Sequence, residues 1–348
     1  RAQRTIEPVR LSRGVVMTTI RDIARAAGVS VSTASLAVNG DPRVRPATRA
    51  KIEAVAASLD YHPSHVARSL SQGRTWSIQL LNPIEKTMSS GFFTRFVAGL
   101  HDGANLHATG VTLAAPSNAE GARTTLERII RERRADGVVF MNVQPDDPLL
   151  DVALNHAYPH VLVGSAVRPD VVTVDSDNHL VALDVTRALL ARGSRSILFL
   201  NGPEALGFTT ARANGFLEAH AELGVEPHPD AVAYTDGTAA EGQRALAERL
   251  DAGVPIDAVI AISDFVAVAA MQILRKRGLA IPEDVRVYGI NDDDVGRYSV
   301  PMLSTVDLRA YELGRTAADL LMNQVEENDT HPARRIVGHR LIERESSA

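Results

Sequence analysis

The sequence predicts a small all-α domain followed by a larger α/β body. Between residues 18 and 62, apolar residues recur every three or four positions, which is typical of short amphipathic helices. From residue 76 onward, short apolar runs alternate with longer amphipathic segments, which is typical of βαβ units and parallel sheets. These runs are too many for one small sheet, so we expect two Rossmann-like parallel-sheet subdomains in the body.

The first predicted helix begins after Thr19. This residue is a preferred N-cap, and the acidic Asp22 follows three positions later, as in a capping box. The apolar residues at helical spacing are Ile20, Ile23, Ala24 and Ala27. Gly28 is expected to end the helix, because glycine adopts the left-handed conformation of a helix C-terminus at no steric cost.

The second predicted helix begins at Val31, with Ser30 as its N-cap. The residues expected to face inward are Ala34, Ala37 and Val38. The stretch from residue 28 to residue 40, GVSVSTASLAVNG, contains no charged side chain. Two short helices joined by a glycine-containing turn form the helix-turn-helix layout.

The third predicted helix begins at Pro46, which suits a first helical position. Its apolar residues at helical spacing are Ile52, Val55, Ala56 and Leu59. This helix would complete a three-helix core. Small helical modules also occur as protein-interaction domains, so the helical pattern alone leaves DNA binding and protein binding both open.

The distribution of charge favours DNA binding. Residues 1–75 contain 12 Lys and Arg against 5 Asp and Glu, a net charge of +7, whereas the whole chain carries −5 and residues 76–348 therefore carry −12. A basic segment attached to an acidic body is typical of a DNA-binding domain joined to another module. The arginines that could contact phosphates are Arg21, Arg43, Arg45, Arg49 and Arg74.

The body is expected to consist of seven apolar strands and the helices between them. The predicted strands are 76–81, 111–115, 136–141, 160–164, 196–201, 258–263 and 285–290. The predicted helices are 94–108, 120–134, 178–192, 211–223, 239–251 and 264–278. The segment VVTVDSDN, residues 171–178, is predicted to cross between the two subdomains.

The headpiece sequence resembles the LacI/GalR family of bacterial transcription regulators. The resemblance lies in TIRDIARAAGVSVSTASLAVNG and, further on, in VRPATRAKIEAVAASLDYHPSHVARSLSQGRT. The body resembles the periplasmic-binding-protein-like core of that family through R-x-x-G-F-x-E-A at 212–219, Y-G-I-N-D at 288–292, P-x-L-S-T-V at 301–306 and H-R-L-I-E-R-E-S at 339–346.

The resemblance implies a division of the chain into domains. A helix-turn-helix DNA-binding domain would span residues 18–62, and a hinge helix with its linker 63–75. An effector-binding and dimerisation domain would span 76–348, with an N-subdomain at about 76–174 and 305–324 and a C-subdomain at about 175–304 and 325–348. Residues 1–17 are expected to be a disordered extension.

The resemblance also implies that the second helix lies in the major groove of an operator. The implied DNA-binding residues of the headpiece are Thr19, Val31, Ser32, Thr33, Ser35, Leu36 and Asn39. Val31, Ser32 and Leu36 stand at the positions that touch base edges. The family's usual Tyr, Val and Arg are replaced by Val31, Ala34 and Leu36. Because Val31 and Leu36 are apolar, we expect the thymine methyl group to be their main partner.

The segment PSHVARSLSQGRT, residues 63–75, matches the hinge helix of the family. Its roughly eight helix-forming residues are too few for a stable isolated helix. Carried over by position, Leu70 would intercalate as a wedge in the minor groove, Ala67 would contact the groove floor and Arg68 would stay near the DNA backbone. The alternative is a linker bounded by proline and glycine in which the leucine is incidental.

An effector is expected in the cleft between the subdomains, beyond the carboxyl ends of the strands. By position, Phe92 and Phe93 would form apolar walls, Arg212 the main polar clamp, and Asp264 and Asn291 further polar contacts. These residue types suit a polyhydroxylated, carbohydrate-like molecule. The alternatives are that both phenylalanines belong to the core, that Arg212 pairs with an acid at the surface and that Asp264 caps the following helix.

Several functional classes are disfavoured by the sequence. Without cysteine, neither a disulfide framework nor a thiolate metal site can form. The motifs G-x-G-x-x-G after the first strand, P-loop, G-x-S-x-G and H-E-x-x-H are all missing, so we expect neither an enzyme nor a cofactor. Asp292, Asp293 and Asp294 are consecutive and would diverge, so we expect no metal site. A transport receptor would need an export signal and no headpiece.

We therefore expect a soluble, cytoplasmic regulator, with repression as its expected action, that binds a pseudo-palindromic double-stranded DNA operator as a homodimer. No apolar run is long enough to cross a membrane. The chain ends without an apolar heptad tail, which favours a dimer over a coiled-coil tetramer. An effector in the cleft would change the angle between the subdomains and bias the hinge helices towards order or disorder.

Overall fold

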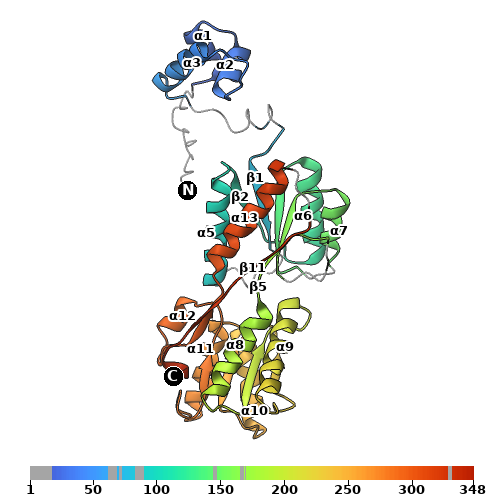
Figure 1. Ribbon diagram of the computed structural model, residues 1–348, viewed down its shortest axis with the longest axis vertical. Coiled ribbons are helices and arrows are strands. Elements are labelled where there is room, and N and C mark those ends of the chain that lie inside the picture. The colour runs from blue at the N-terminus through green and yellow to red at the C-terminus, as the bar shows by residue number, and fades with distance from the viewer. Residues whose placement is uncertain are drawn as a thin grey trace, which may run out of the picture. The chain divides into compact units, whose positions relative to one another are not determined.

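A computed structural model of the chain describes residues 18–61, 69, 73–82, 90–143, 147–164, 168, 170–327 and 331–348 (Figure 1). The chain divides into two compact units, residues 1–75 and 76–348. The expected disordered extension, 1–17, lies outside the described residues, as do the hinge residues Ala67, Arg68 and Leu70. No helix in the described part of the chain is long and apolar enough to cross a membrane.

Residues 18–61 of the first unit form three helices, α1 (Ile20–Ala27), α2 (Val31–Val38) and α3 (Pro46–Ser58), as predicted. Asp22 accepts a hydrogen bond from the Thr19 backbone N–H at 3.0 Å, and Ser30 Oγ accepts one from the Thr33 N–H at 3.1 Å. Gly28 follows α1 with a left-handed φ of 69°. The buried core residues are Ile23, Ala24, Ala27, Ala34, Ala37, Val44 and Ile52. The predicted core residue Leu59 is instead 40% exposed, because it follows the last turn of α3.

The first subdomain of the body contains a six-stranded parallel sheet. Its strand order is β11 (Arg334–Val337), β5 (Thr173–Ser176), β4 (His160–Val163), β3 (Gly137–Met141), β1 (Ser77–Leu81) and β2 (Gly110–Ala114). Helices α5 (Gly91–Asn105) and α13 (Ala310–Glu327) pack on one face, and α6 (Ala119–Glu132) and α7 (Pro148–Asn155) on the other. Alternate side chains of the strands therefore point to opposite faces of the sheet and belong to two separate apolar clusters.

Helices α5 and α13 lie side by side with little room between their backbones (Figure 1). A Cβ atom at Gly99 would clash with the carbonyl oxygen of Tyr311, and one at Gly314 with that of Phe96. Glycine is thus required on both helices for this close approach. The tight packing fixes α5, whose N-terminus faces the second subdomain.

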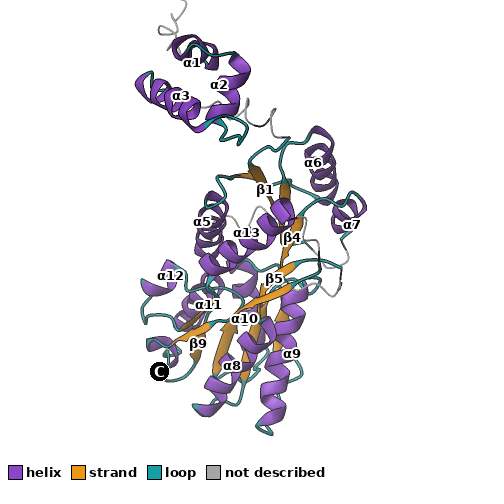
Figure 2. Ribbon diagram, turned by 45° about the horizontal axis from the view of Figure 1, so that its top comes forward, coloured by secondary structure: helices purple, strands orange, loops and turns teal. Residues whose placement is uncertain are grey.

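The second subdomain contains a four-stranded parallel sheet in the order β7 (Val232–Tyr234), β6 (Ile197–Asn201), β8 (Ala258–Ala261) and β9 (Arg286–Tyr288). Helices α8 (Asn178–Ala191) and α9 (Gly207–Glu222) cover one face, and α10 (Ala239–Asp251) and α11 (Asp264–Lys276) the other (Figure 2). A short helix, α12 (Asp294–Arg297), follows β9.

The two subdomains are joined by three crossings of the chain. One follows β5, one precedes α13 and one follows β11. A two-stranded antiparallel sheet, β10 (Thr305–Asp307) and β12 (Arg340–Ile342), accompanies the last two crossings. The structure differs here from the expected division, which assigned 325–348 to the C-subdomain. The main-chain hydrogen bonds of β11 pair it with β5, so residues 334–337 extend the sheet of the first subdomain.

Candidate functional site

The first turn of α2 presents uncharged side chains to solvent. Val31 is 44% exposed and Ser32 is also exposed. Ser30 holds this turn through the Thr33 N–H, and the hydroxyl groups of Ser30 and Thr33 lie 2.8 Å apart. The helix carries no acidic residue in its first turn and no basic residue in its last. This turn can therefore approach another surface closely. The side chains that would meet that surface first are the apolar Val31 and the hydroxyl-bearing Ser32.

Several other predicted DNA-contacting residues of the headpiece make contacts within the domain. Leu36 is half-buried and packs against the core of the headpiece. Ser35 is half-buried, and its carbonyl accepts a hydrogen bond from Asn39 Nδ2 at 3.0 Å, which closes the end of the helix. Thr19 is exposed, and its hydroxyl donates to the Asp22 carboxylate at 2.7 Å. On α2 itself, Val31 and Ser32 are thus the exposed members of the predicted set.

Two of the predicted phosphate-binding arginines make contacts within the loop after α2. Arg43 pairs with Asp41 at 2.7 Å, and the hydrogen bonds from Arg43 lower the pKa of Asp41 to about 2. Arg49 donates to the backbone carbonyl of Asp41 at 2.6 Å. These contacts hold the loop that joins α2 to α3. Arg21 and Arg45 are exposed.

Arg212 lies on α9 and is only 4% exposed. Its Nε donates to Asn178 Oδ1 at 2.8 Å, and its Nη1 donates to the carbonyl oxygen of Ile262 at 3.3 Å. The guanidinium carbon lies 5.1 Å from the ring centroid of Phe208. Burial lowers the pKa of Arg212 to about 10, and the charge of Asp175 opposes this shift. The predicted alternative, an ion pair at the surface, is wrong because the side chain is buried.

Asn178 connects Arg212 to the end of β5. Its Nδ2 donates to Asp175 Oδ1 at 3.0 Å and to the carbonyl of Ser176 at 3.2 Å. Asp175 and Asn178 are both buried. The chain of contacts from Asp175 through Asn178 to Arg212 therefore fixes a guanidinium group at the carboxyl ends of β5 and β8. Sequence reasoning missed Asp175 and Asn178, although both stand in the segment that it predicted to cross between the subdomains.

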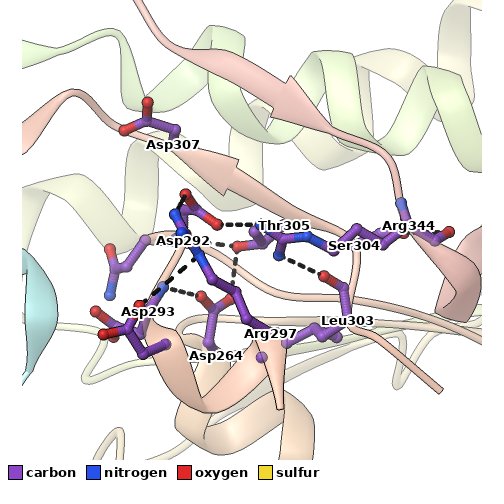
Figure 3. A network of polar contacts seen from close by, with 12 residues as sticks. Asp264, Asp292, Asp293, Arg297, Leu303, Ser304, Thr305, Asp307 and Arg344 are labelled. Carbon is purple, nitrogen blue, oxygen red and sulfur yellow. Dashed lines mark hydrogen bonds and ion pairs between the residues drawn. The ribbon is translucent and has the colours of Figure 1, made fainter. Parts of the chain in front are cut away.

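Asp264 is fully buried at the first position of α11 (Figure 3). Its carboxylate accepts hydrogen bonds from Thr305 Oγ1 at 2.6 Å and from the Asp293 N–H at 2.5 Å. Burial raises the pKa of Asp264 to about 7, with the hydrogen bonds from Thr305 and Asp293 opposing the shift. The side chain that caps α11 is that of Ser263, which accepts from the Val266 N–H, so the capping alternative for Asp264 is wrong.

Asn291 and Asp292 lie in the loop after β9, with positive φ angles of 115° and 51°. The Asn291 N–H donates to the Val306 carbonyl at 2.8 Å. The Asp292 carboxylate lies between Arg344 at 2.5 Å and Arg297 at 2.7 Å (Figure 3). Burial opposes ionisation of Asp292, but these two hydrogen bonds hold its pKa below the usual value. Among the described residues, no cluster of His, Asp and Glu could hold a metal ion.

Phe92 and Phe93 have different surroundings at the start of α5. Phe93 is 7% exposed and belongs to the apolar core of the first subdomain. Phe92 is half-buried, stacks on Phe96 with ring centroids 6.5 Å apart, and packs against clusters of both subdomains. The alternative that the phenylalanines belong to the core thus holds for Phe93, whereas Phe92 packs between the two subdomains.

The structure brings the predicted effector-binding residues to two places. Arg212 donates to the carbonyl of Ile262, the residue after β8, and Asp264 lies two residues further along the chain. Asn291 follows β9, where its carbonyl oxygen accepts a hydrogen bond from Arg95 of α5 at 2.5 Å. Sequence reasoning missed Arg95 and Asp293, whose partners lie about 200 positions away in the chain.

Comparisons with known proteins match both parts of the chain. Residues 19–64 match the family described as bacterial regulatory proteins, lacI family, and residues 186–347 match the periplasmic binding protein-like domain. The HTH-type transcriptional regulator CelR of Thermobifida fusca is 30% identical over 334 residues, covering 94% of this chain and 98% of CelR. The HTH-type transcriptional repressor CytR of Escherichia coli strain K12 is 27% identical, with 94% and 96% covered.

Solved structures that are similar over nearly the whole chain include the following two. A complex of the transcriptional regulator CelR with cellobiose has a TM-score of 0.75 at 29% identity, covering 94% of this chain and 99% of that one. The lac repressor dimer bound to operator and the anti-inducer ONPF has a TM-score of 0.82 at 22% identity, covering 95% and 99%. The second likeness shows that the two chains share a fold.

Proposed function

The chain belongs to the LacI family of bacterial regulatory proteins, and from this membership we propose how its residues read DNA and sense an effector. It is a DNA-binding transcription regulator and not an enzyme. We propose that it acts in the cytoplasm as a homodimeric repressor on a pseudo-palindromic operator. Two headpieces would then present their α2 helices to successive major grooves. The observation that carries this proposal is the capped, uncharged first turn of α2, with Val31 and Ser32 exposed.

We propose that the headpiece, the hinge segment and the body have separate functions. The headpiece, 18–62, would contact the major groove, and the hinge segment, 63–75, would contact the minor groove. Ala67, Arg68 and Leu70 would supply the hinge contacts, with Leu70 as the intercalating wedge. Residues 76–348 would bind the effector and form the dimer.

The proposed effector is a sugar or a related polar metabolite. Arg212 carries five N–H donors, of which the described residues use two. Asn178 and Asp175 hold this guanidinium in place, so its remaining donors are oriented before a ligand arrives. Hydroxyl oxygens of a sugar could accept from these donors, and the Phe92 ring could cover C–H groups of the ligand. The relative CelR, which forms a complex with cellobiose, favours this chemical class.

The experiment that tests operator reading is a double-mutant cycle between Val31 and a thymine methyl group. An operator is first selected from a random library, and each thymine is then replaced by uracil, which lacks the C5 methyl. Val31→Ala removes two methyl groups, worth about 1.5 kcal/mol of apolar contact. We therefore expect roughly tenfold weaker binding.

If Val31 contacts a thymine methyl group, the losses of binding free energy caused by the two changes are not additive. Uracil at one position of each half-site should weaken binding of the wild type and cause no further loss in Val31→Ala. Leu59→Ala is the matched control, because Leu59 is similarly exposed but lies beyond α3. Full additivity at every thymine, or a selected operator in which only guanines matter, would contradict methyl reading by Val31.

A further inference from the structure

The start of α5 in the first subdomain is held by the loop after β9 in the second. Asp293 Oδ1 accepts a hydrogen bond from the backbone N–H of Phe92 at 3.1 Å. Arg95, one turn further along α5, lies 3.5 Å from the same oxygen and donates to the Asn291 carbonyl at 2.5 Å. A Cβ atom at Gly91 would clash with Asp293 Oδ1, so glycine permits this close approach. The two subdomains are thus joined here by side-chain and main-chain contacts between the α5 N-terminus and the loop after β9.

The contact combines three favourable electrostatic features. A carboxylate at a helix N-terminus interacts with the positive end of the helix dipole and with N–H groups that have no partner within the helix. The guanidinium of Arg95 adds an opposite charge. The side chain of Asp293 is 2% exposed, so water screens these interactions little.

The same carboxylate is incompletely satisfied. Within the described residues, Asp293 Oδ2 is buried and has no hydrogen-bond partner. Burial raises the pKa of Asp293, while Arg95 and the α5 backbone oppose the shift. A buried acceptor without a donor is costly, so this arrangement is stable only while the α5 contacts hold it. Such a contact is suited to release when the subdomains move.

The loop is also connected to the interior of the second subdomain. The Asp293 N–H donates to Asp264, whose other oxygen accepts from Thr305 at the start of β10 (Figure 3). The segment from β10 to α13 is one of the three crossings between the subdomains. A movement of Asp293 would therefore disturb contacts with a crossing and with the start of α11.

We propose that Asp293 is a latch between the two subdomains: with Arg95 and the α5 N-terminus, it stabilises the subdomain angle seen here over other angles. Its link to regulation rests on the proposed function, in which effector binding changes that angle. A contact made in one state only shifts the equilibrium between states. Releasing the latch should therefore change operator affinity and effector affinity in opposite directions, if the two ligands prefer different angles.

The distance between the subdomains tests the latch directly in the full chain. The chain has no cysteine, so a pair of introduced cysteines can be spin-labelled without background. Leu106→Cys, after the far end of α5, and Leu223→Cys, after the far end of α9, are exposed positions of opposite subdomains. Labelled chains are mixed with an excess of unlabelled chain, so that a dimer rarely holds two labelled protomers. Double electron–electron resonance without effector or operator then reports the subdomain angle within one protomer.

We expect Asp293→Ala and Arg95→Met each to shift or broaden the distance distribution, and the double variant to add little to either. Asp251→Ala is the matched control, because it breaks an ion pair with Arg277 inside the second subdomain. The Arg95 side chain is 36% exposed, so its replacement disturbs the interior less than that of Asp293. Where Asp293→Ala does not fold, Arg95→Met carries the test alone. We expect operator affinity of the latch variants to change at least fivefold.

The latch is refuted if Arg95→Met and a folded Asp293→Ala both leave the distance distribution of the wild type unchanged, or if Asp251→Ala alters it as much. The proposed function has a separate point of failure. A wild-type distance that neither operator nor any effector changes would refute effector-driven closure, while the effector-free comparison would still decide whether Asp293 sets the angle.

Discussion

Replacement of Arg212 by methionine tests whether this side chain binds the effector or only stabilises the fold. Methionine has a similar length and fills most of the volume between Asn178 and Phe208, so the cavity term is small. The change removes one hydrogen bond of 2.8 Å to the Asn178 amide and one of 3.3 Å to the Ile262 carbonyl. It also removes a charge that is costly to bury, as the lowered pKa of Arg212 indicates.

The expected loss of stability is modest and the expected loss of ligand affinity is large. A hydrogen bond to a charged group contributes about 1.5 to 3 kcal/mol, and relief of the desolvation cost offsets part of it, so we expect a net destabilisation of about 1 to 2 kcal/mol. Each hydroxyl that accepts from the guanidinium contributes a similar amount in the complex. Loss of one such contact weakens effector binding by roughly 10- to 150-fold.

The assay first identifies a ligand by thermal shift over sugars, with cellobiose included, and then measures affinity by calorimetry. Arg187→Met is the control, since it breaks an ion pair with Glu222 between α8 and α9 at the surface. Operator binding without effector should be retained in Arg212→Met. Effector affinity within twofold of the wild type, in a folded Arg212→Met protein, would remove Arg212 from the binding site.

Two further predictions concern Asp264 and Leu70. Burial raises the pKa of Asp264 to about 7, so the folded state keeps a proton that the unfolded chain releases near pH 4. The contribution of Asp264 to stability is therefore lost as the pH rises from about 4 to 7. In urea titrations, the unfolding free energy of the wild type should fall over that range relative to that of Asp264→Asn, which has no proton to lose at this position. A difference between the two proteins that does not change with pH would contradict this prediction. Leu70→Ala should weaken operator binding in gel shifts and leave effector affinity unchanged, and equal loss of both would contradict the wedge role.

Most helices and strands could be predicted because their apolar periodicity depends on local sequence alone. The segments 239–251 and 264–278 coincide with α10 and α11 to within two residues. The largest missed element is α13, an 18-residue helix with a buried apolar face that the predicted segments did not include. Several other missed elements are short or polar. Strand β11 contains Arg334 and Arg335 and is largely exposed, so no apolar run marks it, and only its hydrogen bonds to β5 make it a strand. Its place in the first sheet is set by the path of the chain between subdomains, which periodicity does not encode.

The candidate site could be predicted only in part, for a related reason. Spacing and resemblance selected Arg212, Asp264 and Asn291, but not the side chains that orient them. Asn178 bonds to Arg212 across 34 positions, and Asp293 bonds to the α5 backbone across 201. Such pairs arise from the packing of separate elements. A run of three aspartates was a visible signal, but their different partners, Arg344 and Arg297 for Asp292 and the α5 N-terminus for Asp293, appear only in three dimensions.

The burial of Leu36 sharpens the argument about how the proposed operator is read. A half-buried Leu36 leaves Val31 and Ser32 as the leading contacts of α2, and neither can replace the arginine–guanine contact of the family. Arg43 and Arg49 are engaged within the headpiece, which leaves fewer charges for phosphates. A headpiece with few strong contacts binds weakly by itself, so we expect operator affinity to depend heavily on the proposed hinge segment and on the dimer that would pair two hinges. An effector that alters the subdomain angle would then control a larger share of the binding free energy than in a regulator whose reading helix binds tightly alone.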